Sequence, residues 1–320
     1  MSKTCLIRLS SLWLWMAVMC NADPVWAAAG SNVTGGGAVD GLWWFWPLIL
    51  LVFCFFLGIL TPLSGVGRGI LYVALVNAFF PFHLDFVRGA GLLVGLAGAL
   101  TAGPGFLKRN LANLRLCLPV ALITSVCAIF GAFLGLALPT NIVQICLGAT
   151  IILIAALLVA SSNIKRPVAT NQDFLGWALG MSGVYFEEST GERVGWMTHR
   201  TFVGFLFFIV IGIMAGMFGF GAGWANVSVL NVVMGVPLKV AVGSGKYLLS
   251  ITNTSAAWVY LNQGAVIPLI AIPSIVGLML GSFAGVRILA VVKPKSIRYI
   301  VIAVLLFAGG KALLKGLGIG

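Results

Sequence analysis

Two glycine clusters are the features of this sequence with the clearest chemical meaning. Residues 65–69 read GVGRG and residues 219–223 read GFGAG, and each cluster lies inside a long apolar stretch. Three glycines in five residues weaken a helix, because glycine costs about 1 kcal/mol relative to alanine in a helix interior. A broken helix exposes free N–H groups and a positive dipole end, which attract anions. The clusters therefore predict a cavity for a negatively charged solute.

Close helix crossing is the alternative explanation for glycines in apolar segments. Small residues at intervals of three or four let two helix backbones approach each other. Gly91, Gly95 and Gly98 fit that pattern and are interpreted in this way.

Basic residues without acidic partners also favour an anion. The acidic residues number seven, and none follows position 192. Lys246 nevertheless lies inside an apolar segment, where an unpaired charge costs about 3 kcal/mol or more. Arg68 lies within the first cluster, where it either contacts the solute or anchors the helix at the cytoplasmic side. Both interpretations of Arg68 stay open.

Further polar residues accompany these two cations. Lys246, Ser250 and Asn253 are spaced i, i+4 and i+7, which places them on one helix face. For any single hydroxyl or amide, an ordinary hydrogen bond between helices is the alternative. The predicted substrate-binding residues are Gly65, Gly67, Arg68, Gly69, Asn77, Gly219, Gly221, Gly223, Asn231, Ser244, Lys246, Ser250 and Asn253.

Energy coupling has one candidate pair in the sequence. Proton-driven transporters use carboxylates or histidines within the membrane, and the apolar part of the chain offers His83 and Asp85. Arg88 follows Asp85 by three residues, the spacing of an ion pair within one helix. Sodium coupling through backbone carbonyls would leave no signature in the sequence.

The composition predicts that most of the chain faces lipid. Of 320 residues, 61% are hydrophobic and 8% are charged, whereas soluble domains carry about 25% charged residues. Continuous apolar runs of about 20 residues predict membrane-spanning helices rather than a barrel. We expect an all-α polytopic membrane protein with 8–10 transmembrane segments. The apolar runs are 42–60, 66–82, 86–107, 116–138, 142–162, 201–218, 220–236, 240–261, 265–290 and 297–316.

An internal repeat relates the two halves of the chain. A shift of 154 positions aligns the glycines of both clusters, and also Asn77 with Asn231 and Pro119 with Pro273, without a gap. The expected repeats are residues 42–162 and 201–320. Five crossings in each repeat would make the second repeat inverted relative to the first. If segments 66–82 and 220–236 only re-enter the membrane, the number of crossings falls to eight.

The remaining segments are assigned from composition and charge. Residues 1–29 resemble a secretory signal peptide, with an uncleaved anchor as the alternative, and residues 30–41 are a glycine-rich linker. Residues 163–200 are interpreted as a polar cytoplasmic loop, because basic loops lie in the cytoplasm. Lys311 and Lys315 then lie on the unfavourable side of a ten-crossing chain.

The two clusters, the segment AVGSG at 241–245 and the duplication resemble the sulfite exporter TauE/SafE family of membrane permeases. The resemblance covers about residues 45–315. It implies alternating-access transport of sulfite, an organosulfonate or a related small anion across the bacterial cytoplasmic membrane. By position it implies a site at Gly65, Gly67, Arg68, Gly69, Gly219, Gly221, Gly223, Ser244 and Lys246.

Other function classes have less support in the sequence. The chain lacks HExxH and GxSxG motifs and has two histidines, so an intramembrane enzyme, a metal site and a cofactor are not expected. The net charge of +12 reflects basic loops rather than nucleic-acid binding. An accessory or assembly subunit of an envelope complex is the alternative. The expected partners are a small anionic solute and the lipid bilayer, and a homo-oligomer stays open.

Overall fold

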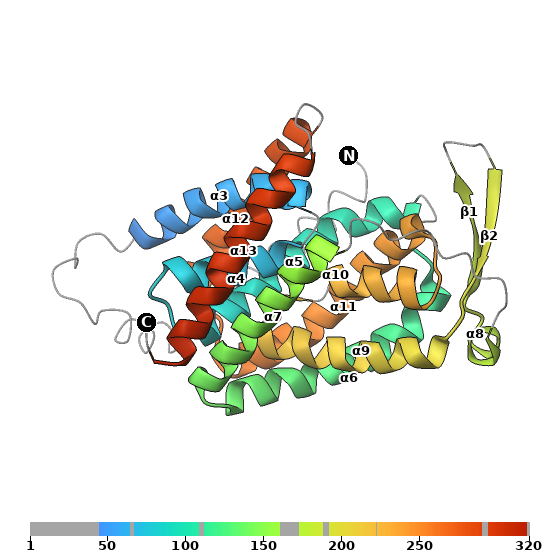
Figure 1. Cartoon of the computed structure of the whole chain (residues 1–320), viewed down its shortest axis with the longest axis horizontal. Helices are drawn as coiled ribbons and strands as arrows, with labels where there is room; N and C mark the ends of the chain where they lie inside the picture. The colour runs from blue at the N-terminus through green and yellow to red at the C-terminus, as the bar shows by residue number, and fades with distance from the viewer. Residues whose placement is uncertain are drawn as a thin grey trace, which may run out of the picture. The chain divides into compact units, whose positions relative to one another are not determined.

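The described part of the chain is almost entirely helical. The computed structural model describes residues 45–64, 67–108, 112–160, 173–187, 192–221, 223–289 and 294–318. The predicted signal peptide and glycine-rich linker lie outside these residues. The first-half helices are α3 (Phe45–Ser64), α4 (Arg68–Phe79), α5 (Leu84–Lys108), α6 (Leu114–Ala137) and α7 (Thr140–Ala160) (Figure 1). The second-half helices are α9 (Thr201–Phe218), α10 (Gly223–Ser228), the π-helix η2 (Val229–Val233), α11 (Leu238–Asn262), α12 (Pro268–Leu289) and α13 (Pro294–Gly316).

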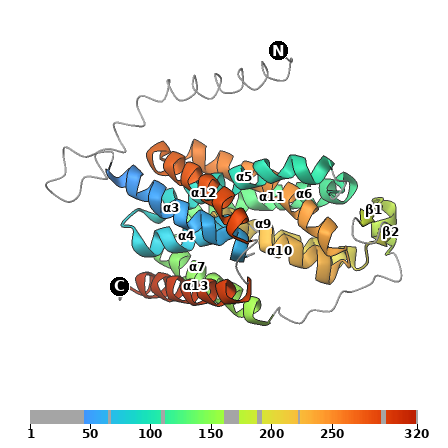
Figure 2. The same ribbon diagram turned by 90° about the horizontal axis from the view of Figure 1, so that it is seen from above.

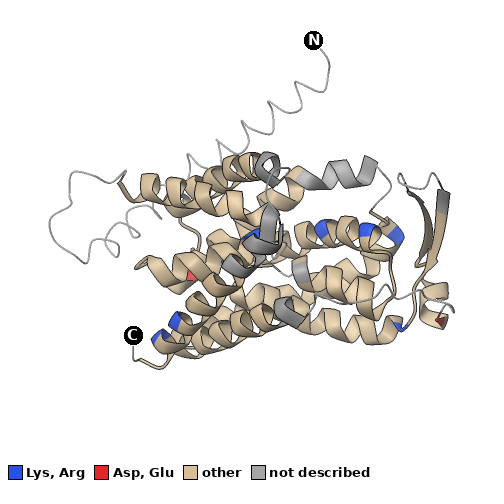
Figure 3. Cartoon of the chain, turned by 45° about the horizontal axis from the view of Figure 1, so that its top comes forward, with Lys and Arg blue, Asp and Glu red and all other residues tan. Residues whose placement is uncertain are grey.

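Several of these helices suit a lipid environment. Among the described residues, four helices hold an apolar window long enough to cross a membrane: Leu84–Thr101, Leu114–Ala137, Thr201–Phe218 and Pro268–Gly285. Large apolar side chains on their outer faces are exposed, for example Leu122 (69%) and Phe130 (68%) on α6. Charged residues are sparse along the described helices, and basic residues outnumber acidic ones (Figure 3).

The helix ends follow local sequence rules. Asn113 caps α6, since its side-chain oxygen accepts hydrogen bonds from the backbone N–H groups of Arg115 (3.0 Å) and Leu116 (3.3 Å). The same helix ends before Leu138, which precedes Pro139 and is extended, with φ −77° and ψ 147°. α9 ends at Phe218 and is capped by Gly219, whose φ of 71° is the left-handed conformation typical of glycine at a helix C-terminus.

The segment between the two halves contains regular secondary structure in its described residues. It contains α8 (Phe174–Ala178) and an antiparallel hairpin of β1 (Ser182–Glu187) and β2 (Glu192–Met197) (Figure 1). Two apolar residues explain its order: Met181 and Trp196 are 0% and 7% exposed and join the core formed by α6, α9, α10 and α11. Asp173 secures the start of α8, because its carboxylate accepts from the N–H groups of Phe174 and Thr201.

Helices of opposite halves pack side by side in the same direction. On α9, Gly212 lies against Thr124 of α6, and Gly216, one turn later, lies against Ala128, also one turn later. The helices α3 and α12 also pack side by side in the same direction. Gly277 lies against the Leu51 backbone.

Gly285, two turns after Gly277, lies against the Ile59 backbone, so α3 and α12 are parallel as well. α7 and α13 are antiparallel, because Gly309 contacts Ile152 whereas Gly316 contacts Ile145. Figure 2 shows these last two helices side by side. In Figure 1, α3 and α9 run in opposite directions.

Corresponding helices occupy corresponding positions in the sequence. Adding 154 to the bounds of α5, 84–108, gives 238–262, which are the bounds of α11. Adding 154 to the bounds of α4, 68–79, gives 222–233, and α10 with η2 covers 223–233. The packing corresponds too: Gly91 lies against Val73, and Gly245, 154 positions later, lies against Val227.

Candidate functional site

Both glycine clusters interrupt helices, as predicted, and the two breaks contact each other. α3 ends at Ser64 and α4 begins at Arg68, while α9 ends at Phe218 and α10 begins at Gly223. Gly67, Gly219 and Gly221 have positive φ values of 103°, 71° and 65°, which other residues rarely adopt. Gly69 packs directly on the backbone carbonyl of Phe220. The start of α4 therefore lies against the second break.

A face of α5 made by Gly91, Gly95 and Gly98 receives groups from both breaks. A Cβ atom on Gly95 would lie 2.5 Å from Nδ2 of Asn253 on α11. A Cβ atom on Gly98 would lie 2.6 Å from Nη1 of Arg68. The sequence predicted this face as an ordinary helix crossing, yet its glycines make room for two polar side chains.

Lys246 and Arg68 form the centre of the candidate site. On α11, Lys246 lies two turns before Asn253 on the same face, with Leu249 between them in contact with Gly221 and Gly223. Arg68 begins α4, directly after the first break, and its guanidinium lies against Gly98 of α5. Both side chains are partly exposed, and among the described residues no carboxylate pairs with either of them. Each cation therefore lacks a carboxylate partner within the described part of the chain.

Asn253 brings an unused hydrogen-bond acceptor to this region. Its side chain is fully buried, and its Nδ2 donates to the Leu92 carbonyl on α5 at 3.2 Å. Its Oδ1 has no hydrogen-bond partner among the described residues. This oxygen lies next to Gly221, since it would be 2.7 Å from a Cβ atom there. The amide thus joins α5, α11 and the second break.

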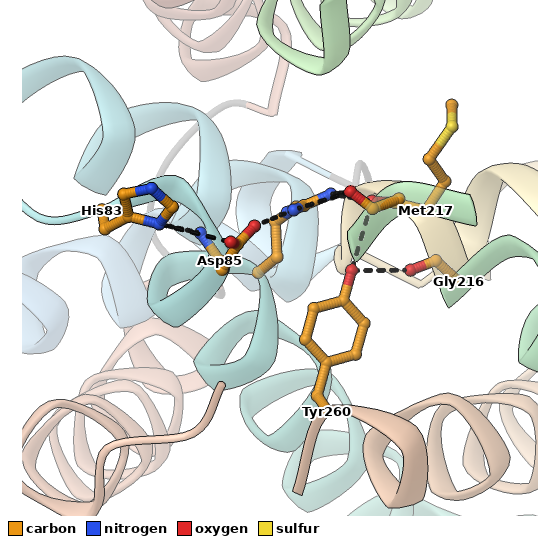
Figure 4. A network of polar contacts seen from close by, with 7 residues as sticks. His83, Asp85, Gly216, Met217 and Tyr260 are labelled. Carbon is orange, nitrogen blue, oxygen red and sulfur yellow. Dashed lines mark hydrogen bonds and ion pairs between the residues drawn. The ribbon is translucent and has the colours of Figure 1, made fainter. Parts of the chain in front are cut away.

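His83 and Asp85 belong to a different network at the start of α5 (Figure 4). Nδ1 of His83 lies 3.3 Å from Oδ2 of Asp85, and Oδ1 of Asp85 pairs with Arg88, which confirms the predicted ion pair. Arg88 is 1% exposed. Its Nη1 donates to the carbonyls of Met217 (2.8 Å) and Gly135 (3.1 Å).

Tyr260 adds a second donor to the end of α9, a residue that the sequence did not single out. Its hydroxyl donates to the carbonyls of Gly216 (3.1 Å) and Met217 (3.3 Å), and the Arg88 guanidinium lies 5.8 Å from its ring centre (Figure 4). Carbonyls in the last turn of a helix lack helical partners, and a cation near them is favourable. This network anchors the end of α9 directly before the second break.

Three other predicted site residues, Ser244, Ser250 and Asn231, make their side-chain hydrogen bonds outside this centre. The Ser244 hydroxyl accepts from the N–H of Asn113 at 3.2 Å and points to the start of α6. The Ser250 hydroxyl donates to the carbonyl of Tyr247 at 2.7 Å. Asn231 Nδ2 donates to the Val236 carbonyl at 2.8 Å and closes the turn after η2.

Asn77 lies nine residues after Arg68 on α4, a separation of about 13 Å along a helix. It is 2% exposed, and its Oδ1 has no hydrogen-bond partner among the described residues. Gly65 lies outside the described residues. The centre therefore comprises Gly67, Arg68, Gly69, Gly219, Gly221, Gly223, Lys246 and Asn253.

Comparison with known proteins agrees with this geometry. The family described as sulfite exporter TauE/SafE matches residues 50–312, which is most of the chain. The chain belongs to the TauE/SafE family. This confirms the resemblance seen in the glycine clusters, and it makes the protein a multi-pass membrane transporter rather than an enzyme.

A curated relative supports the same conclusion. The chain is 23% identical over 277 residues to the probable membrane transporter protein YunE of Bacillus subtilis (strain 168). That match covers 84% of this chain and 98% of the relative. No solved structure matches the chain.

Proposed function

We propose that this TauE/SafE protein is a secondary transporter for a small anion, sulfite, an organosulfonate or a related sulfur oxyanion. The transported anion binds between the two helix breaks and crosses the bacterial cytoplasmic membrane by alternating access. The sulfur chemistry is suggested by the family description, sulfite exporter. The bacterial relative and the continuous apolar helices support the choice of membrane.

One observation carries the proposal: Arg68 directly follows the first break, Lys246 lies one turn before Leu249 at the second, and neither pairs with a carboxylate among the described residues. Two like charges in an apolar environment destabilise the folded protein. An anion between them removes this repulsion and gains charge-assisted hydrogen bonds. Bound negative charge therefore stabilises this arrangement.

Alternating access is supported by the arrangement of the two halves. We propose that they are inverted repeats, because α3 and α9 run in opposite directions and the helix bounds correspond at a spacing of 154. Inverted repeats with broken helices at matching positions are typical of transporters whose binding site lies between the repeats. Rocking of one half against the other would expose the site to each side in turn.

Transport in reconstituted vesicles tests the function. Purified protein in liposomes should move radiolabelled sulfite down its gradient, and Lys246→Met should abolish this movement. Lys315→Met, the same change near the end of α13, is the control and should transport at the wild-type rate. Unchanged flux with Lys246→Met would contradict the proposal. Absence of flux for every sulfur oxyanion with wild type would favour an accessory or assembly role.

For the driving ion, we propose that His83 and Asp85 form the proton-binding pair. The two side chains contact each other, and Asp85 also pairs with Arg88, which donates to the last turn of α9. Protonation of Asp85 would weaken that ion pair and so loosen the end of α9 before the second break. Vesicles with a trapped pH dye should show proton movement when sulfite is added. Asp85→Asn should abolish proton movement while sulfite still binds, and Asp173→Asn should behave as wild type. Wild-type proton movement in Asp85→Asn would exclude this pair.

A further inference from the structure

Phe174 and Trp177 form an exposed aromatic face on the short helix α8, which the proposed transport does not use. The two side chains are 75% and 69% exposed, and their ring centres lie 6.4 Å apart. Leu179, directly after the helix, is exposed as well. Large aromatic side chains gain free energy when they leave water. The described part of the chain leaves this face uncovered, so its favourable environment lies outside the chain.

The contacts of α8 hold this face in one orientation. Gly176 packs closely on the start of α9, because a Cβ atom there would lie 2.5 Å from the hydroxyl oxygen of Thr198 and 3.1 Å from that of Thr201. The carboxylate of Asp173 accepts hydrogen bonds from the backbone N–H groups of Phe174 and Thr201. These contacts join α8 to α9 and prevent the aromatic face from turning inward.

The length of α9 places α8 at the edge of the membrane. The apolar window Thr201–Phe218 has 18 residues, which is about 27 Å of helix, whereas the hydrocarbon core is about 30 Å thick. All of α9 is therefore needed for the crossing, and Phe202 and Leu206 are exposed on its first two turns. Figure 1 shows α8 beside this end of α9. The headgroup region, where tryptophan is enriched, thus lies at the level of α8.

Basic residues lie at the same end of the bundle (Figure 3). Arg200 directly before α9 and Arg115 at the start of α6 are exposed, and neither pairs with a carboxylate among the described residues. The side chain of Arg115 lies beside Gly180, just after α8, at 3.9 Å from a Cβ atom there. Arg115 also borders an open hollow of about 360 Å³ between α6 and β1. This end therefore offers positive charge to an anionic surface.

We propose that α8 is an interfacial anchor that docks on anionic phospholipid. Phe174 and Trp177 insert among the lipid headgroups, and Arg115 and Arg200 bind the lipid phosphates beside them. The anchor fixes the start of α9, the helix that ends at the second break. It does not depend on which solute the protein transports.

The fluorescence of Trp177 tests the anchor in the full chain. Its emission is the difference between wild type and Trp177→Phe in nanodiscs of phosphatidylcholine and phosphatidylglycerol. Lipid that carries bromine on its acyl chains close to the headgroup should quench this emission, and aqueous iodide should not. Phe174→Trp adds a second reporter, which should be quenched in the same way. Trp196→Phe isolates the buried Trp196 of the same segment, which either quencher should affect much less.

Placing the bromine on one lipid at a time tests the role of the two arginines. At equal amounts of both lipids, brominated phosphatidylglycerol should quench Trp177 as if enriched at least about five-fold over brominated phosphatidylcholine, the enrichment that one basic residue near an anionic surface gives. Arg115→Gln combined with Arg200→Gln should make the two lipids equal. Lys315→Gln, near the end of α13, should keep the difference. Melting temperatures check that each variant is folded.

Three results would overturn the inference. Quenching of Trp177 by iodide and not by brominated lipid would place α8 in water. Protection from both quenchers would show that a second copy of the chain or another protein covers the face. Equal quenching of wild type by the two brominated lipids would remove the role of Arg115 and Arg200.

Discussion

The two helix breaks share a position in their halves but differ in what surrounds them. The first break carries a cation within its own glycine cluster, Arg68, and continues into the regular helix α4. The second break has no charge in the cluster and continues into six residues of α10 and a π-helix. Its cation, Lys246, comes from the following helix. The two breaks thus share a glycine-rich backbone pattern, but the cation beside each comes from a different place in the sequence.

The anchoring of the two breaks differs as well. Arg88 and Tyr260 hold the carbonyls at the end of α9. The positions 154 residues away, Val242 and Phe106, carry no hydrogen-bonding side chain. The second break is therefore fixed by a polar network, whereas the contact described for the first break is that of Gly69 with the Phe220 backbone. This contrast predicts that the second break is the more sensitive to loss of a polar group.

Arg88→Leu should produce the largest loss of stability. It leaves the Gly135 carbonyl without this donor, the Met217 carbonyl with Tyr260 as its side-chain donor, and Asp85 without its buried counter-charge. Removing one partner of a buried ion pair costs about 3 kcal/mol or more, discounted here because Asp85 is 26% exposed. Thermal unfolding of the purified protein in detergent measures the change. A melting temperature equal to that of wild type would contradict the claim that the polar network anchors the second break.

Gly69→Ala should have the next largest effect, since it acts on the contact between the breaks. The added Cβ atom would overlap the Phe220 carbonyl, and backbone on both sides must shift. Overpacking of this kind costs about 1–3 kcal/mol, and sulfite flux should fall along with the melting temperature. Gly310→Ala is the matched control, because nothing lies within 4 Å of a Cβ atom there. Equal behaviour of the two variants would show that the breaks do not depend on this contact.

Asn113→Ala should have the smallest of these effects, because Asn113 caps α6 and belongs to neither break. Asn113 caps α6, donates its backbone N–H to Ser244 and its Nδ2 to the Ser182 carbonyl of β1 at 3.2 Å. Loss of the cap costs about 1 kcal/mol. Limited proteolysis should cut the β1–β2 hairpin faster than in wild type, at similar sulfite flux. An unchanged cutting rate would show that the buried Trp196 holds the hairpin without Asn113.

The sequence predicted the broken helices because glycines with positive φ leave a compositional signature. Gly67, Gly219 and Gly221 were all marked by their clusters. It also identified Lys246 and Asn253 as neighbours on one face, since helical spacing alone places them there. These predictions rest on local geometry, which a sequence encodes directly.

The sequence did not predict contacts that depend on how helices pack. Tyr260 reaches the end of α9 from 43 and 44 positions away, and nothing in its surroundings marks it as polar and functional. Ser244 was assigned to the site, yet its hydroxyl faces Asn113. The ordered hairpin was missed because its burial depends on two residues, Met181 and Trp196, inserted between distant helices.

The central claim is that one anion bridges Arg68 and Lys246, and an anomalous diffraction map tests it most directly. Crystals grown with selenate, a divalent tetrahedral oxyanion, are measured at the selenium absorption edge. The account predicts a selenium peak between the two side chains, with oxygens within hydrogen-bond reach of both the guanidinium and the ammonium. A peak elsewhere in the bundle, or Arg68 and Lys246 each paired with a protein carboxylate, would contradict it.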